Sequence, residues 1–82
     1  MNTVFLLMAQ YGATTLIPIN FVCRDYFSHL TPEKLLSKAS AGEIALPLVR
    51  MEGSQKSIKG VHVEDLAKYI EVRRAAALKE CH

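Results

Sequence analysis

The sequence lacks the features that mark secreted and membrane-inserted proteins. Its 82 residues include only two cysteines, Cys23 and Cys81, with no CxxC and no paired Cys/His spacing. Small secreted scaffolds normally carry more cysteines, so we expect a reduced, intracellular protein with no metal site. The first 23 residues carry no charge, but their apolar run 4–9 is shorter than the ~20 residues of a membrane helix. The basic start of a signal peptide is missing too.

Catalytic motifs are missing as well. The chain has no Gly-rich phosphate loop, no GxSxG and no HExxH. His29 is expected in a turn and His62 on a strand, and neither has a nucleophile near it in the sequence. The sequence therefore predicts a protein that is not an enzyme, with no catalytic residue, no cofactor and no small-molecule substrate.

What the chain does contain is a high share of apolar residues. Half of the residues are hydrophobic, which argues against a disordered chain. The length predicts one domain over residues 1–82, and for so small a domain this hydrophobic fraction is high. Some apolar surface is therefore expected to remain exposed in a monomer, which favours a homodimer. Ten Lys and Arg against eight Asp and Glu give a net charge of +2, so the position of the basic residues matters more than their sum.

The N-terminal segment predicts a short helix over residues 3–11, capped by Asn2 or Thr3 and ended by Gly12. This helix is apolar on nearly every side, so it either packs on its own domain or is shared with a second chain. Both interpretations stay open. The residues predicted for dimerisation are Val4, Phe5, Leu7, Met8 and Tyr11.

The middle of the chain predicts a short strand and two helices joined by a tight turn. Pro18 interrupts a β-rich segment, which is typical of an edge strand. Thr31 can cap the second helix, and Pro32 suits the first helical position. The expected elements are a strand over 14–19, a helix over 21–28 capped by Asn20, and a helix over 32–41 that ends at Gly42.

The second of these helices has one basic face. Leu35, Leu36 and Ala39 form its apolar stripe. The opposite face carries no carboxylate to neutralise its lysines. Its members are Lys34, Ser37, Lys38 and Ala41.

A polar hairpin and a long helix complete the chain. The hairpin is expected from strands over 48–51 and 61–63, with Lys56 and Lys59 in the connection. The last helix is expected over 65–80, and its end should leave the core because arginines interrupt its apolar stripe. Glu64 and Asp65 mark its start, and Arg73 and Arg74 are the interrupting residues.

This order of elements is the plan of a winged helix-turn-helix, an α+β fold, here with an additional apolar N-terminal helix. The recognition helix would lie at about 31–41 and the wing at about 48–63. Surface lysines are mostly just solvated, and what favours DNA is their occurrence on two consecutive elements that point the same way. The residues predicted to bind DNA are Thr31, Pro32, Lys34, Ser37, Lys38, Arg50, Ser54, Gln55, Lys56, Ser57 and Lys59.

The chain resembles the pyocin activator protein family of Pseudomonas and related prophages. The resemblance is carried by MNTVFLLMAQYG, IPINFVCRDYFSHLTPEKLLSKASAGEI, LPLVR and GSQKSIKGVHVEDLAKYI. It implies a small transcription activator of phage-tail-like bacteriocin genes, switched on in the DNA-damage response and similar in plan to excisionase and AlpA-type regulators. Residues 31–41 would then be the recognition helix and 52–60 the wing.

Three positions depart from the family pattern. Positions 37 and 45 are often basic in the family, whereas this chain has Ser37 and Ala45. The loss of two phosphate contacts would lower affinity or alter the preferred site. Phe21 stands where an acidic residue is expected, and its exposure would indicate an extra contact.

The leading hypothesis is a sequence-specific activator of pyocin or prophage genes. It would bind repeated elements in double-stranded promoter DNA as a homodimer, in the bacterial cytoplasm at the nucleoid, with RNA polymerase as a candidate partner. The first alternative is an excisionase-like architectural protein that bends DNA. The second is a protein-interaction module such as an antirepressor, which the low net charge keeps open.

Overall fold

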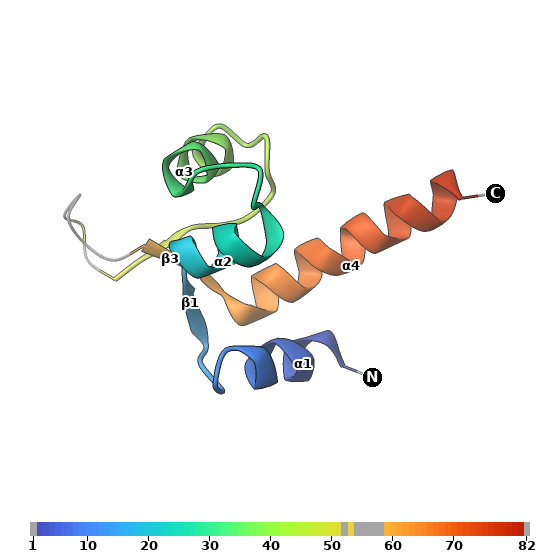
Figure 1. The fold of residues 1–82 in the computed structure, drawn as a ribbon, viewed down its shortest axis with the longest axis horizontal. Helices are drawn as coiled ribbons and strands as arrows, with labels where there is room; N and C mark the ends of the chain where they lie inside the picture. The colour runs from blue at the N-terminus through green and yellow to red at the C-terminus, as the bar shows by residue number, and fades with distance from the viewer. Residues whose placement is uncertain (1, 52, 54–58, 82) are drawn as a thin grey trace.

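Within residues 2–51, 53 and 59–81, which the computed structural model describes, four helices and a three-stranded antiparallel sheet follow one another in the predicted order (Figure 1). The α+β class is thereby confirmed. The helices are α1 (Thr3–Gln10), α2 (Ile19–Tyr26), α3 (Pro32–Ser40) and α4 (Val63–Glu80), and the strands are β1 (Leu16–Pro18), β2 (Val49–Arg50) and β3 (Lys59–His62).

Two helices begin where their capping residues predict. The Asn2 side chain accepts a hydrogen bond from the Val4 backbone N–H at 2.8 Å and starts α1. Thr31 Oγ1 accepts one from the Lys34 N–H at 3.2 Å, and Pro32 occupies the first position of α3.

The other two helices begin earlier than predicted. The predicted cap Asn20 lies inside α2, because β1 runs straight into the helix through Pro18, whose extended backbone takes the capping position without a side-chain bond. In α4 the predicted start at Asp65 is late by two residues. The cap there is His62, whose Nδ1 accepts a hydrogen bond from the Glu64 N–H at 3.1 Å.

The sheet has the order β1–β3–β2, so β3 pairs on both sides. Pro18 lies on the edge strand β1, as predicted, opposite Gly60. A Cβ at position 60 would lie 2.8 Å from the Ile17 carbonyl oxygen, so glycine lets the two strands approach. The predicted strand over 48–51 is shorter in the structure, where only Val49 and Arg50 pair.

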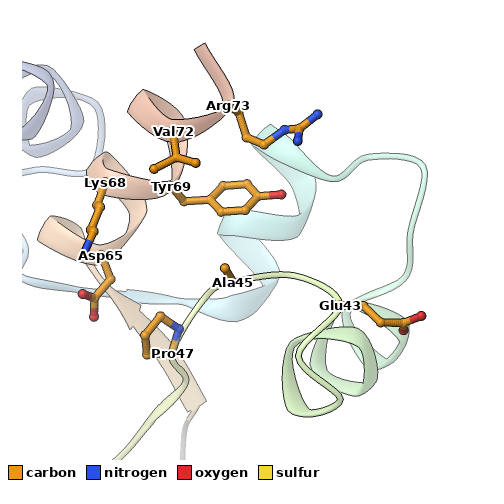
Figure 2. A pocket seen from close by; sticks show the side chains of 8 residues that line it. All are labelled: Glu43, Ala45, Pro47, Asp65, Lys68, Tyr69, Val72 and Arg73. Carbon is orange, nitrogen blue, oxygen red and sulfur yellow. The ribbon is translucent and has the colours of Figure 1, made fainter. Parts of the chain in front are cut away.

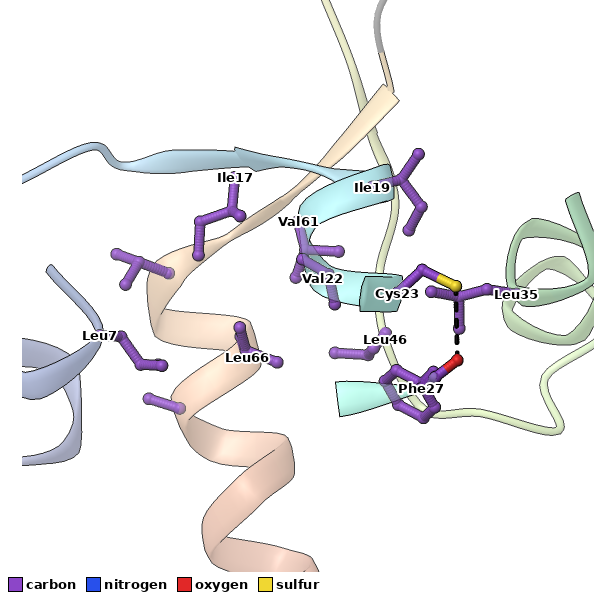
Figure 3. Packing of buried hydrophobic residues seen from close by; sticks show 12 residues of the cluster. Leu7, Ile17, Ile19, Val22, Cys23, Phe27, Leu35, Leu46, Val61 and Leu66 are labelled. Atoms are coloured by element: carbon purple, nitrogen blue, oxygen red, sulfur yellow. Dashed lines mark hydrogen bonds between the residues drawn. The ribbon is translucent and has the colours of Figure 1, made fainter. Parts of the chain in front are cut away.

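One hydrophobic core joins all the helices to the sheet (Figure 3). Leu35 brings α3 into it with no exposed surface, and Leu66 does the same for α4. The Cys23 thiol is buried and donates to the backbone carbonyls of Phe27 at 3.4 Å and Leu30 at 3.1 Å. The other buried members are Leu7, Ile17, Ile19, Val22, Phe27, Leu46, Val61, Val63 and Ala67.

The helix α1 packs on α4 of its own chain. Leu7 is 3% exposed in the core, and Val4, Met8 and Tyr11 pack against the core, so this side of α1 is used within its own chain, one of the two interpretations that the sequence left open. The physical reason is that α4 offers an apolar surface that α1 covers. Of the five residues predicted for dimerisation, only Phe5 is largely exposed, at 69%.

The helix α4 extends beyond the rest of the molecule (Figure 1). Its side chains from position 71 onward are exposed, except for the partly buried Ala76. This agrees with the prediction that the helix leaves the core around Arg73. None of the helices in the described ranges is long and apolar enough to span a bilayer.

Candidate nucleic-acid interface

The helix α3 presents its polar face outward because its opposite side is anchored in the core. Leu35 is fully buried, and Leu36 and Ala39 are partly buried beside it, as their spacing predicts. Lys34 and Ser37 are exposed on the other side. Figure 1 shows α3 beside α2 and at a distance from α1 and α4.

The basic side chains of α3 are available to an anion. Lys34 is exposed and Lys38 is partly buried, and neither makes a salt bridge with another described residue. Thr31 and Pro32, at the start of the helix, are exposed as well. The Thr31 oxygen accepts the capping bond from the Lys34 N–H, and its hydroxyl hydrogen remains to donate to a ligand.

The base of the hairpin places two positive charges side by side. Arg50 on β2 lies directly opposite Lys59 on β3 in the antiparallel register. Side chains in such a pair have their Cβ atoms about 5 Å apart, and like charges there destabilise a sheet. No salt bridge links either residue to a carboxylate among the described residues. An external anion would relieve this repulsion.

The tip of the hairpin lies outside the described residues. The predictions for Ser54, Gln55, Lys56 and Ser57 fall there. Among the predicted DNA-binding residues that the structure describes, Arg50 and Lys59 form a pair across two strands. The others lie at the start of α3 or on it.

A polar network joins α1 to α2. Asp25 accepts hydrogen bonds from the Tyr11 hydroxyl at 2.6 Å, from Arg24 Nε at 2.9 Å and from Gln10 at 3.3 Å. The bonds from Arg24 and then Tyr11 lower the pKa of the Asp25 carboxyl to about 2. Burial, reinforced by the bond to Asp25, raises the pKa of Tyr11 and keeps its hydroxyl a donor.

This network was not predicted from the sequence, because Tyr11 and Asp25 are fourteen residues apart. It holds the first helix of the α2–α3 pair against α1. It also neutralises Arg24, which pairs with Asp25 and lies 4.9 Å from the centre of the Phe21 ring. Phe21 is 40% exposed, which is the condition under which the sequence would indicate an extra contact. Arg24 is therefore already engaged and adds little to the basic surface.

A hollow of about 400 Å³ lies on another part of the molecule, between α4 and the segment that follows α3 (Figure 2). Val72 and Tyr69 of α4 border it on one side, and Ala45 and Pro47 on the other. Its charged lining has both signs, unlike the α3 face. Among the described residues, no group of three or more His, Cys, Asp or Glu side chains is arranged to hold a metal ion.

Comparison with known proteins adds independent information. A family model described as "Pyocin activator protein PrtN" matches residues 3–77, which run from the start of α1 into the last turns of α4. The description is that of a regulatory class and not of an enzyme class. No curated protein and no solved structure matched the chain.

Proposed function

This chain belongs to the pyocin activator protein family, and from that premise we propose that it activates pyocin or prophage genes by binding promoter DNA in a sequence-specific way. In this proposal α2 and α3 act as a helix-turn-helix, α3 is the recognition helix, and the β2–β3 hairpin is the wing. The protein acts as a homodimer on repeated promoter elements.

The observation that carries the proposal is the like-charge pair of Arg50 and Lys59. A ladder position occupied by two cations costs stability, by up to about 1 kcal/mol for such a pair. DNA phosphates would turn that cost into attraction, because each oxygen accepts hydrogen bonds from both side chains. Lys34 of α3 is exposed, so the helix that would enter the major groove also carries a positive charge.

Each part of the proposed interface has its own task. Ser37 lies on the exposed face of α3, where a hydroxyl can reach a base edge or a phosphate. Lys34 and Lys38 neutralise the phosphates that border the groove, and Arg50 and Lys59 neutralise those under the hairpin. The tip residues, among them Lys56, extend this contact in the proposal. Activation then requires a contact with RNA polymerase or a bent promoter.

The test is a salt-dependent titration of two fluorescent duplexes, a pyocin-type promoter fragment and a scrambled one. We expect preferential binding to the promoter, with affinity that falls as salt rises. The double variant Arg50→Ala/Lys59→Ala should lower the log–log salt slope by about 0.9 for each phosphate contact removed. Lys68→Ala, an exposed lysine of α4, is the matched control and should leave the slope unchanged.

The other outcomes separate the alternatives. Binding that bends DNA without raising transcription from the promoter would make the protein architectural, as in an excisionase. Folded protein that binds neither duplex, or an unchanged slope in the double variant, would refute the proposed interface and favour a protein-interaction module.

A further inference from the structure

The outward face of α4 carries apolar side chains that no other described element covers. Its centre is Ala75, which follows the buried Leu66 by nine residues, or about two and a half turns, and so lies on the opposite side of the helix. Three residues before and after Ala75 stand Val72 and Leu78, which are 57% and 59% exposed. Two such side chains on a projecting helix form a face that water does not favour.

Charges on this face are arranged symmetrically about Ala75. Glu71 precedes it by four residues and Lys79 follows it by four, so both share the face of Ala75. An identical helix laid antiparallel across Ala75 would therefore place Val72 at the level of Leu78 and Glu71 at the level of Lys79 along the helix pair, each pair twice. Glu71 already accepts a hydrogen bond from Thr3 and lies 3.9 Å from Arg74, but half of its side chain remains exposed. The pattern is self-complementary, as a two-fold interface requires.

We propose that two copies of this chain associate through the outward faces of their α4 helices, antiparallel and crossing at Ala75. This inference rests on the homodimer of the proposed function and identifies its interface. The two chains would associate in this way without DNA.

The shape of the molecule favours this interface over the exposed side of α1. Phe5 and Leu6 are also exposed, at 69% and 52%, but α1 carries no charge that would select a register or an orientation. The projecting part of α4 lies away from α3 and the hairpin, so pairing there leaves the basic surface free (Figure 1). Val72 also borders the hollow beside Ala45 and Pro47 (Figure 2).

A charge exchange tests the register by sedimentation equilibrium. Glu71→Lys and Lys79→Glu each set like charges opposite one another at two places, and each should weaken the dimer about tenfold or more. The double variant Glu71→Lys/Lys79→Glu restores both pairs and should return to within about threefold of the original dissociation constant. Phe5→Glu is the control on α1 and should have no effect. The proposal is overturned if the original chain stays monomeric, if the double variant is no tighter than the single ones, or if only Phe5→Glu produces monomers.

A crosslinking experiment tests the position of the axis without altering charge. In a Cys81→Ser background, Ala75→Cys meets its own copy on the two-fold axis and should form a disulfide-linked dimer under mild oxidation. Ala77→Cys is equally exposed but lies on the other side of the helix, so it should stay uncrosslinked. Equal crosslinking of the two variants, or none at Ala75→Cys, would place the interface elsewhere.

Both experiments are made without DNA, whereas the titration proposed above can use a duplex with one element. An original chain that stays monomeric but binds that duplex would refute the α4 interface alone. Intact association without DNA binding would refute only the proposed function.

Discussion

Gly60 on β3 lies in close contact with β1, where there is no room for a side chain. A methyl group there would meet the Ile17 carbonyl oxygen at 2.8 Å and the Leu16 side chain at 3.0 Å. Because one of these atoms is backbone, it cannot move away cheaply. We expect Gly60→Ala to lower the free energy of unfolding by about 1–3 kcal/mol, measured by urea denaturation. At Gly53→Ala no atom of the described residues lies within 4 Å of the new one, so this variant should change little; equal losses in the two variants would contradict a steric cause.

Asp25 makes the join between α1 and α2 sensitive to acid. Its pKa is lowered to about 2 in the folded protein, compared with about 3.9 in an unfolded chain. The folded state therefore favours the carboxylate, and this contribution is fully present above about pH 4 and is lost as the pH falls towards 2. We expect the urea midpoint of the original chain to fall over that window more steeply than that of Asp25→Asn. Glu80→Gln, at the exposed end of α4, should keep the original slope; identical slopes in all three proteins would show that the network does not contribute.

Which site residues can be predicted depends on how far apart their partners lie in the sequence. The face shared by Lys34 and Ser37 follows from helical spacing alone, and the structure exposes both. The pairing of Arg50 with Lys59 depends on the register of the hairpin, which composition does not set. The bond between Tyr11 and Asp25 is formed only when α1 docks, so no local pattern indicates it.

At the scale of the element, the start of α3 is fixed by a local signal. Thr31 Oγ1 accepts the Lys34 N–H, and its loss would leave that donor without an intrahelical partner. We expect Thr31→Ala to lower the free energy of unfolding by about 1 kcal/mol and Thr31→Ser to leave it nearly unchanged. Urea denaturation followed by circular dichroism measures both. If Thr31→Ser is as unstable as Thr31→Ala, the methyl group and not the cap is responsible.

The helix α1 has a buried side and an exposed side that its sequence does not distinguish. Leu7 fills the core at 3% exposure, whereas Phe5 is 69% exposed. We expect Leu7→Ala to cost about 2–5 kcal/mol, because it leaves a cavity in the core. Phe5→Ala should stay within about 0.5 kcal/mol. Chemical denaturation below the concentration at which chains associate measures both, and a larger effect at Phe5 would mean that α1 docks through its other face.

Element boundaries follow the sequence where a common capping side chain caps the helix, and they fail where the backbone or a rarer capping side chain sets the start. Asn2 and Thr31 cap as predicted. Asn20 does not, because β1 continues into α2 at Pro18. His62 caps α4 through a ring nitrogen, and histidine is less common as a cap than Ser, Thr, Asp or Asn. The helix therefore starts at Val63, two residues before the predicted start at Asp65.

At the scale of the whole molecule, the chain is more extended than its length requires. The Cα radius of gyration is 13.2 Å, compared with about 12 Å for a compact chain of this size, and the principal extents are 46 × 28 × 19 Å. The projecting half of α4 extends the molecule along its long axis (Figure 1). Its Ala, Arg, Leu, Lys and Glu residues are strong helix formers, which lets it stay helical without tertiary contacts.

The projecting half of α4 therefore contributes little to folding, and a truncated chain can separate folding from association. The buried members of the core end at Ala67, with Ile70 packed against them, and the contacts of Glu71 with Thr3 and Arg74 survive in a chain that ends at Arg74. We expect that chain to unfold within about 1 kcal/mol of the full one when both are monomeric, since the free energy of unfolding is set by the core. It should remain monomeric in sedimentation at concentrations where the full chain associates, because Ala75, Leu78 and Lys79 are gone. A folded truncated chain that still dimerises would place the interface on the body, whereas a chain that no longer folds would show that the projecting turns support the core.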